Sequence, residues 1–154
     1  MENSPVAGLQ LKNTDKIMGA ARVKVKLTNA TDEALARRGQ LPPAQVRTYE
    51  AMALIDTGAV STVIPPYVMQ QLGLMSRGRR VVEYADGRQE PMEVTEPILF
   101  ELSGRDTLEE ALVLDDEVLI GQTVLKKLDL YVDCAGQRLA PNPAHPDQPV
   151  LTVK

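Results

Sequence analysis

One aspartate stands where a charged residue is unusual. Asp56 directly follows the apolar run Ala53-Leu54-Ile55, which has the character of a buried strand, and it precedes Thr57 and Gly58. An isolated carboxylate is costly beside apolar groups, so such a side chain is either hydrogen-bonded or titrates abnormally. A polar turn after a strand also explains these residues, and Asp-Thr-Gly occurs by chance in about 3% of chains of this length. The motif becomes informative only together with the elements around it.

Those elements are short. Stretches of β-branched and apolar residues predict strands at about 17–28, 46–55, 62–64, 80–84, 93–95, 97–103, 108–114, 118–121, 130–134 and 138–139. Two prolines before residue 67 favour a helix over 67–72, and a second helix is predicted over 122–128. A further helical possibility lies at 32–38. Many short strands with only two clear helices indicate an all-β fold.

A hairpin is predicted around Asp86 and Gly87. These two residues separate the strand-like runs 80–84 and 93–95. Asp-Gly in this setting is a strong hairpin signal, because a type I′ turn needs positive φ at both central positions. The basic cluster Arg77–Arg80 is expected in the loop before this hairpin.

Composition excludes several classes of protein. The chain has 154 residues, a net charge of −4, one cysteine and one histidine, so an internal disulfide and a single-chain Cys/His zinc site are ruled out. The longest apolar run, 51–55, is far shorter than a membrane helix, and the N-terminus lacks a secretory pattern. We therefore expect an intracellular, cytoplasmic protein with no membrane partner.

Charge is unevenly distributed, with 11 basic and 6 acidic residues in 1–80 against 6 basic and 15 acidic in 81–154. Arg22, Lys24 and Lys26 alternate with apolar residues, which is typical of a strand with one solvated face. The few aromatics and the acidic total favour a solvated surface over a nucleic-acid site. One domain over 16–140 is expected, with a flexible arm at 1–15 and a Pro-rich tail at 141–154.

Three motifs in order resemble the retropepsin-like aspartic proteases, in their bacterial form. The first is Leu54 to Ala59, reading LIDTGA; the second is the hairpin 81–94; the third is Leu119-Ile120-Gly121, 65 residues after Asp56, followed by a helix. The segment 128–139 also resembles the C-terminal hairpin of bacterial members. This resemblance covers residues 17–140 and implies a closed acid-protease-like β-barrel with a flap hairpin and one or two short helices.

The resemblance implies an aspartic endopeptidase with Asp56 as the catalytic residue. Two carboxylates sharing one proton can act as base toward a water molecule and as acid toward the peptide carbonyl, so no metal or cofactor is needed. Thr57, Gly58 and Ala59 would support the active-site loop, and Ile120 and Gly121 would support the barrel. A set of flap residues would cover a peptide or protein substrate: Tyr84, Ala85, Asp86 and Gly87.

A single Asp-Thr-Gly implies a second copy of the chain. No second lobe fits in 154 residues, so two Asp56 side chains would have to meet across the two-fold axis of a homodimer. Chain ends of such proteases share a sheet, and Val150–Val153 or Leu9–Leu11 are candidates for that strand.

Two departures from the retroviral pattern stand out. Retroviral members often carry an Asp–Arg ion pair at the positions of Val60 and Gln122, and both partners are absent here. Tyr84 near the flap turn is closer to the tyrosine-bearing flap of pepsin-like enzymes, so we expect it to cover the substrate. An ordinary cross-strand aromatic is the alternative interpretation.

Other site candidates are weaker. Cys134 with His145 could suggest a thiol protease, but His145 is expected in a mobile proline-rich tail. Ser61 lacks the flanking glycines of a nucleophile elbow. The acidic run 115–117 lacks the spacing of a calcium loop, and Asp129 and Asp133 are expected to cap or pair on the surface. A catalytically silent peptide-binding module on the same barrel is the alternative function.

Overall fold

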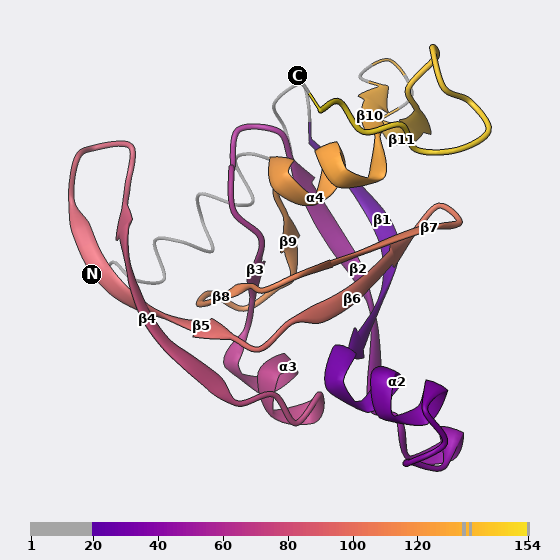
Figure 1. Cartoon of the computed structure of the whole chain (residues 1–154). Helices are drawn as coiled ribbons and strands as arrows, with labels where there is room; N and C mark the ends of the chain where they lie inside the picture. The colour runs from indigo at the N-terminus through magenta and orange to yellow at the C-terminus, as the bar shows by residue number, and fades with distance from the viewer. Residues whose placement is uncertain (1–19, 134, 136, 154) are drawn as a thin grey trace.

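The computed structural model describes residues 20–133, 135 and 137–153 (Figure 1). Its strands are β1 (Ala20–Asn29), β2 (Thr48–Asp56), β3 (Val63–Ile64), β4 (Ser76–Glu83), β5 (Gln89–Thr95), β6 (Ile98–Leu102), β7 (Arg105–Glu109), β8 (Leu112–Val113), β9 (Leu119–Ile120), β10 (Leu130–Asp133) and β11 (Arg138–Pro141). The helices are α2 (Ala30–Arg37), α3 (Pro66–Gln71) and α4 (Gln122–Leu128), with a 3₁₀ turn, η1, at Pro43–Gln45. The mostly β fold is confirmed, but three short α-helices replace the expected one or two.

A curled nine-stranded sheet forms the body of the molecule. Its strand order is β4-β5-β8-β3-β9-β2-β1-β6-β7, while β10 and β11 form a separate hairpin. Most neighbours are antiparallel, but β9 runs parallel to β2, and β8 runs parallel to β3. The sheet curls into a half-barrel, with β4 and β7 at its two ends. Closure of the barrel stays a prediction.

The β1–β2 pair shows why this sheet has one wet face. Antiparallel pairing over nine residues places Ala20 opposite Asp56 and Thr28 opposite Thr48. Along β1, Val25 and Leu27 are buried, while Arg22, Lys24 and Lys26 are exposed. The alternation confirms the predicted solvated face, since successive side chains of a strand point to opposite sides.

One apolar core is enclosed by the curled sheet. Its largest fully buried side chains include Leu27, Ile55, Phe100 and Ile120 from the strands. The helices close the core with buried apolar residues: Val68 and Leu72 from α3 and its end, and Val124, Leu125 and Leu128 from α4. Ile55 and Ile120 are 0% exposed, so the strands that lead to the Asp56 loop are anchored in this core.

The predicted hairpin is confirmed as β4 and β5, but its turn differs from the prediction. Gly87 N–H donates to the Tyr84 carbonyl at 2.9 Å, and Tyr84 N–H donates to the Arg88 carbonyl at 2.8 Å. Gly87 has φ +86°, whereas Asp86 is not among the residues with positive φ. The connection is therefore a three-residue loop ending in a left-handed glycine, not a type I′ turn.

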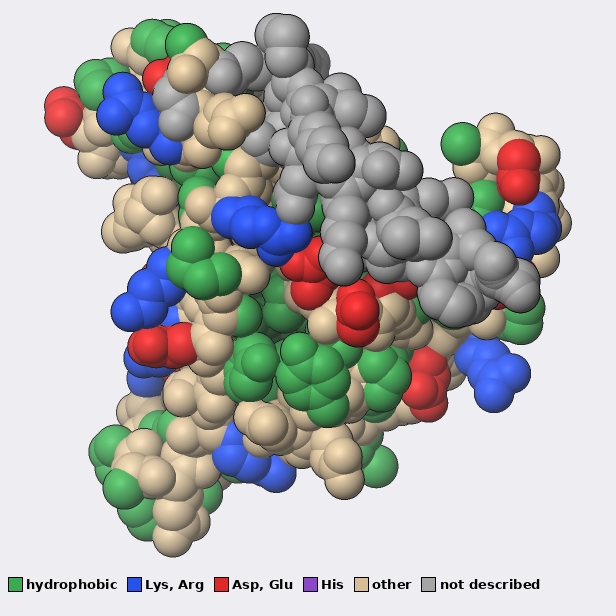
Figure 2. Space-filling model, turned by 180° about the vertical axis from the view of Figure 1, so that it is seen from behind, with side chains coloured by type: hydrophobic (Ala, Val, Ile, Leu, Met, Phe, Trp, Pro, Cys, Tyr) green, Lys and Arg blue, Asp and Glu red, His purple; other side chains and the backbone are tan. Residues whose placement is uncertain are grey.

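The hairpin projects from the body of the molecule (Figure 1). When the molecule is seen from behind, the tip of the hairpin forms a separate lobe at the upper right (Figure 2). Arg77–Arg80 lies within β4 rather than in the expected loop before it, and these residues are exposed. We call this hairpin, residues 76–95, the flap.

A buried carboxylate joins α2 to the start of β2. The Asp32 side chain is 8% exposed and accepts two bonds from the Arg47 guanidinium, at 2.8 and 3.0 Å, and one from the Arg47 backbone N–H at 3.1 Å. The guanidinium holds the pKa of Asp32 below its ordinary value of 3.8, against the opposing effect of burial. The ion pair therefore stabilises the fold wherever Asp32 is ionised.

Arg47→Met should lower the free energy of unfolding, because it leaves the buried Asp32 carboxylate without its cation. The loss should be largest above about pH 4 and should shrink as the pH falls through the lowered pKa of Asp32, where the wild-type pair is itself lost. Urea denaturation at several pH values measures it. The control is Arg37→Met, which removes the exposed pair with Glu33 on the same helix. Equal effects of both variants at every pH would contradict the prediction.

Candidate functional site

The loop that follows β2 gives Asp56 hydrogen-bond donors. Gly58 N–H donates to Asp56 Oδ1 at 2.8 Å, and Ala59 N–H donates to the Asp56 carbonyl at 3.1 Å. Asp56 is the last residue of β2 and is partly exposed, directly after fully buried Leu54 and Ile55. The unusual charge seen in the sequence is thus a hydrogen-bonded carboxylate at the solvent end of a core strand.

Strand β9 brings the third sequence motif beside this loop. Leu119 and Ile120 pair in parallel with Leu54 and Ile55, and Leu54 N–H donates to the Val118 carbonyl at 3.0 Å. Because the paired strands β2 and β9 run in the same direction, Gly121 lies next to the residues that follow Asp56.

Gly121 must be a glycine because backbone fills the space where a side chain would lie. A Cβ there would lie 2.5 Å from the Ser61 carbonyl oxygen and 2.6 Å from that of Val60. Gly121 N–H also donates to Thr62 Oγ1 at 3.0 Å. This contact joins residues 59 apart in the chain and presses β9 against the Asp56 loop.

The first turn of α4 completes the support of the loop. Gln122 N–H donates to the Ala59 carbonyl at 2.9 Å, and Thr123 N–H donates to the Val60 carbonyl at 3.1 Å. The Gln122 side-chain amide donates to the Thr57 carbonyl. In the sequence, Gln122 stood out only as the residue at the position of a retroviral arginine. Its amide side chain, directly after the Leu119-Ile120-Gly121 motif, was the available signal for a supporting role.

A second set of contacts anchors α4. The single hydroxyl proton of Thr123 is shared between two acceptors, the Val60 carbonyl at 3.2 Å and Glu109 Oε2. Glu109 pairs through its other oxygen with Lys127 at 3.0 Å. Glu109 and Lys127 were not among the predicted site residues, because nothing in the spacing of the sequence places β7 beside α4.

The flap residues lie together at the hairpin tip. The Arg88 guanidinium carbon stands 4.3 Å from the centre of the Tyr84 ring, a cation–π contact. Burial, followed by the Glu90 charge, raises the pKa of Tyr84 above its usual value. Ala85, Asp86 and Gly87 are exposed. No hydrogen bond in the described part of the chain joins these residues to the Asp56 loop, so a substrate-covering role for Tyr84 stays a prediction.

Two grooves border the Asp56 loop. One of about 500 Å³ lies between flap strand β4, residues 61–62 and residues 109–112, and its apolar lining includes Val81, Val82 and Val94. The other, of about 890 Å³, lies between α4, β10 and the tail, and Thr57 and Gln122 form part of its wall. The two loop residues Ser61 and Thr57 therefore face different grooves.

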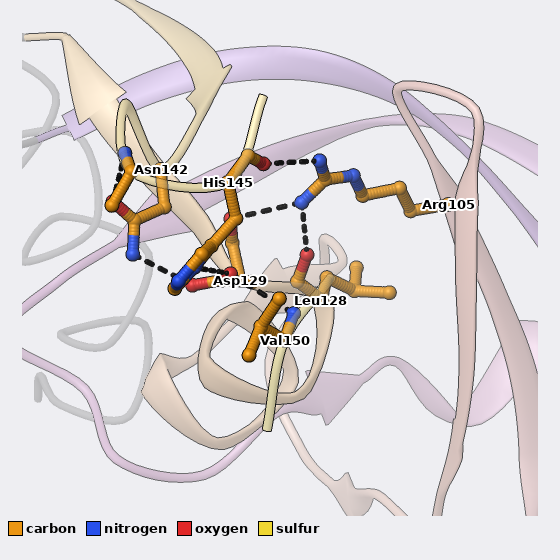
Figure 3. Close-up of polar contacts among 7 residues, drawn as sticks. Arg105, Leu128, Asp129, Asn142, His145 and Val150 are labelled. Atoms are coloured by element: carbon orange, nitrogen blue, oxygen red, sulfur yellow. Dashed lines mark hydrogen bonds and ion pairs between the residues drawn. The ribbon is translucent and has the colours of Figure 1, made fainter. Parts of the chain in front are cut away.

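The tail is anchored, and this corrects two expectations (Figure 3). Asp129 ends α4 with φ +57° and is buried at 8% exposure, not on the surface. Its carboxylate accepts from Asn142 Nδ2 at 3.0 Å and Val150 N–H at 3.1 Å, and it lies 2.7 Å from His145 Nδ1. The Asn142 bond, followed by the Val150 and His145 bonds, lowers the pKa of Asp129. His145 is thus held by a buried acid, although the tail was expected to be mobile.

Arg105 completes this anchor from the sheet. Its guanidinium donates to the carbonyls of Leu128, Asp129 and His145 at 2.9, 3.1 and 3.0 Å. Asp133 pairs with Arg138 across the β10–β11 hairpin. Residues 150–153 form no strand in the structure, and Leu9–Leu11 and Cys134 lie outside the described residues.

The remaining candidates offer no metal centre. Asp115, at φ +66°, has its pKa raised by burial and then by the charges of Asp116 and Glu117. Among the described residues, no three His, Cys, Asp or Glu side chains are placed to hold a metal ion. Ser61 is exposed in the loop after Asp56.

No helix in the described part of the chain is both long and apolar enough to cross a membrane.

The family model described as "gag-polyprotein putative aspartyl protease" matches residues 42–127, more than half of the chain. The chain belongs to this retropepsin-like family, which confirms the resemblance. A comparison with curated proteins gives no match. The matched range contains the Asp56 loop, the flap, β9 and nearly all of α4.

Gly121→Ala should lower the free energy of unfolding by about 1–3 kcal/mol, because its Cβ would overlap backbone atoms that cannot move independently. Gly58→Ala is the matched comparison, since its Cβ would lie 3.2 Å from Asp56 Oδ1 and meets no other heavy atom within 4 Å. Gly58→Ala should lower the free energy of unfolding by a smaller amount. Guanidinium denaturation of both variants gives the two values. A Gly121→Ala protein as stable as wild type would contradict the close approach.

Proposed function

We propose that this protein is an aspartic endopeptidase whose active site forms between two copies of the chain. The family supports hydrolysis of peptide bonds at the coarser level. The observation that carries the finer proposal is the Asp56 carboxylate, hydrogen-bonded by Gly58 and partly exposed in the Asp-Thr-Gly loop.

The proposed reaction uses water and two carboxylates. One ionised Asp56 takes a proton from a water molecule while the oxygen of that water bonds to the peptide carbonyl carbon. The protonated Asp56 of the second copy gives its proton to the carbonyl oxygen. The tetrahedral intermediate then collapses: its C–N bond breaks, and the amine nitrogen takes up the proton held by the carboxyl pair. One hydroxyl of the intermediate returns its proton to the pair, which leaves a carboxylic acid product and a pair that again shares one proton. Two adjacent carboxylates favour a single shared proton, because like charges at close range oppose a second ionisation.

A second copy of the chain is the proposed source of the second carboxylate. The sequence contains one Asp-Thr-Gly, and Asp56 of a symmetry-related copy would complete the pair. Thr57, next to Asp56, forms part of the wall of the larger groove, whose lining also includes Tyr131, Val150 and Leu151. These three side chains are 55%, 43% and 67% exposed. Apolar groups beside Thr57 support contact with a second copy on this face.

An extended peptide is the proposed substrate. The flap offers strand backbone near the smaller groove, and extended peptides commonly bind by adding main-chain hydrogen bonds to such strands. Val81, Val82 and Val94 would contact apolar substrate side chains in this groove. We propose that Tyr84 closes over the peptide from the flap tip, with no cofactor required.

Asp56→Asn should reduce the hydrolysis of a denatured protein substrate by about 10²–10⁴-fold, the range expected for loss of a catalytic acid or base. Initial rates measured from about pH 3 to pH 8 cover the range in which carboxylates titrate. Asp106→Asn, at an exposed carboxylate of β7, is the control and should leave the rate unchanged. Full activity in the Asp56 variant would rule out the proposal. Peptide binding without hydrolysis by the wild-type chain would favour the silent binding module instead.

Leu151→Asp should weaken the dimer, because it places a charge on the apolar wall of the larger groove. Burying a leucine contributes roughly 1.5–3 kcal/mol, so the dimer dissociation constant should rise about tenfold or more. Sedimentation equilibrium measures this constant. Met75→Asp is the control: Met75 is 69% exposed, close to the 67% of Leu151. It lies in the sequence between α3 and β4, and α3 is at the other end of the molecule from the tail (Figure 1). Identical dissociation constants for both variants, or a monomeric wild type at high concentration, would contradict a dimer contact at Leu151.

A further inference from the structure

The peptide unit between Thr57 and Gly58 is held by hydrogen bonds at both of its polar atoms. Its carbonyl oxygen accepts from the Gln122 side-chain amide, and its N–H donates to Asp56 Oδ1 at 2.8 Å. A trans peptide unit is planar, with its C=O and N–H pointing in opposite directions. A group that fixes the carbonyl direction therefore also fixes the direction of the N–H that reaches Asp56.

Gln122 is itself rigidly placed. It opens α4, its backbone N–H is bonded to Ala59, and its side chain is partly buried. The preceding Gly121 is locked against the carbonyls of Val60 and Ser61. Val124 and Leu128 are fully buried and anchor the rest of the helix in the core. The amide that bonds Thr57 therefore starts from a backbone position that the Gly121 contact and the bond to Ala59 both hold in place.

The bond has an electronic consequence as well as a geometric one. Hydrogen bonds in series polarise one another, so an amide donating to the Thr57 carbonyl strengthens the Gly58 N–H as a donor. Asp56 lies at the receiving end of this series.

We propose that Gln122 is a positioning residue for Asp56, acting through the Thr57–Gly58 peptide plane. This inference rests on the proposed function, because it assigns a role to Gln122 within that same active site. It also accounts for the missing retroviral ion pair: the residue in the arginine position supports its own loop by a neutral amide, so Val60 needs no charge.

Two variants of Gln122 test the proposal. Gln122→Met keeps the length of the side chain and removes the donor. Gln122→Glu has nearly the same shape, cannot donate when ionised, and regains an O–H donor when protonated. The unperturbed pKa of glutamate is about 4.3, within the range over which an aspartic protease can be assayed. Gln71→Met, at an exposed glutamine ending α3, is the matched control.

The Met variant should lose about tenfold or more in kcat at every pH, with KM changed less than about twofold. The Glu variant should have a kcat as low as that of the Met variant near about pH 6.5. Its kcat should recover toward the wild-type value below about pH 4.5. Each rate is divided by the wild-type rate at the same pH, which removes the profile of Asp56 itself. Wild-type kcat in the Met variant would overturn the proposal, as would parallel pH behaviour of the two variants.

Hydrogen–deuterium exchange provides a readout that does not need activity. Amides of residues 57–60 should exchange faster in the Met variant than in wild type or in Gln71→Met, and unchanged exchange would overturn the role of Gln122. Absence of Asp56-dependent hydrolysis in wild type would instead refute the proposed function. In that case the exchange result alone decides whether Gln122 holds the peptide plane.

Discussion

Gly121 lies so close to the backbone of Val60 and Ser61 that no side chain fits between them, and the geometry of the Asp56 loop depends on this contact. Parallel pairing of β2 with β9 brings the two segments together, and the buried Ile55 and Ile120 hold that pairing in the core. Once the backbones touch, the first turn of α4 can donate to the carbonyls of Ala59 and Val60. Main-chain contacts therefore hold the loop in place, together with the side chains of Thr62 and Gln122.

Buried carboxylates serve a different purpose in this fold: each attaches a peripheral segment to the sheet. Asp32 holds the start of β2 against α2 through Arg47, and Asp129 holds the tail through Asn142, His145 and Val150. Both have lowered pKa values, since hydrogen bonds to the ionised form outweigh the cost of burial. Asp56 has a simpler environment: within the described part of the chain, Gly58 N–H donates to its carboxylate, and the residue is partly exposed.

Much of the site could be predicted because its signals are local. The apolar run before Asp56, the Asp86-Gly87 turn and the Leu119-Ile120-Gly121 motif each depend on a few neighbouring residues, and the structure contains a strand, a hairpin and a strand there. The turn type was wrong because Asp-Gly also fits a three-residue loop with one left-handed glycine. The tail was misjudged because its prolines suggested mobility, whereas a distant carboxylate and Arg105 hold it.

The class of fold, the positions of the short strands and the candidate carboxylate Asp56 could be predicted from the sequence, because alternation and turn chemistry act over short distances. Three features became visible only in the folded chain: the Gln122 amide bonds Thr57, Glu109 and Lys127 anchor α4, and Asp129 is buried against the tail. These contacts join residues 13 to 65 positions apart. Nothing in their local sequence specifies a partner, since the curl of the sheet brings them together.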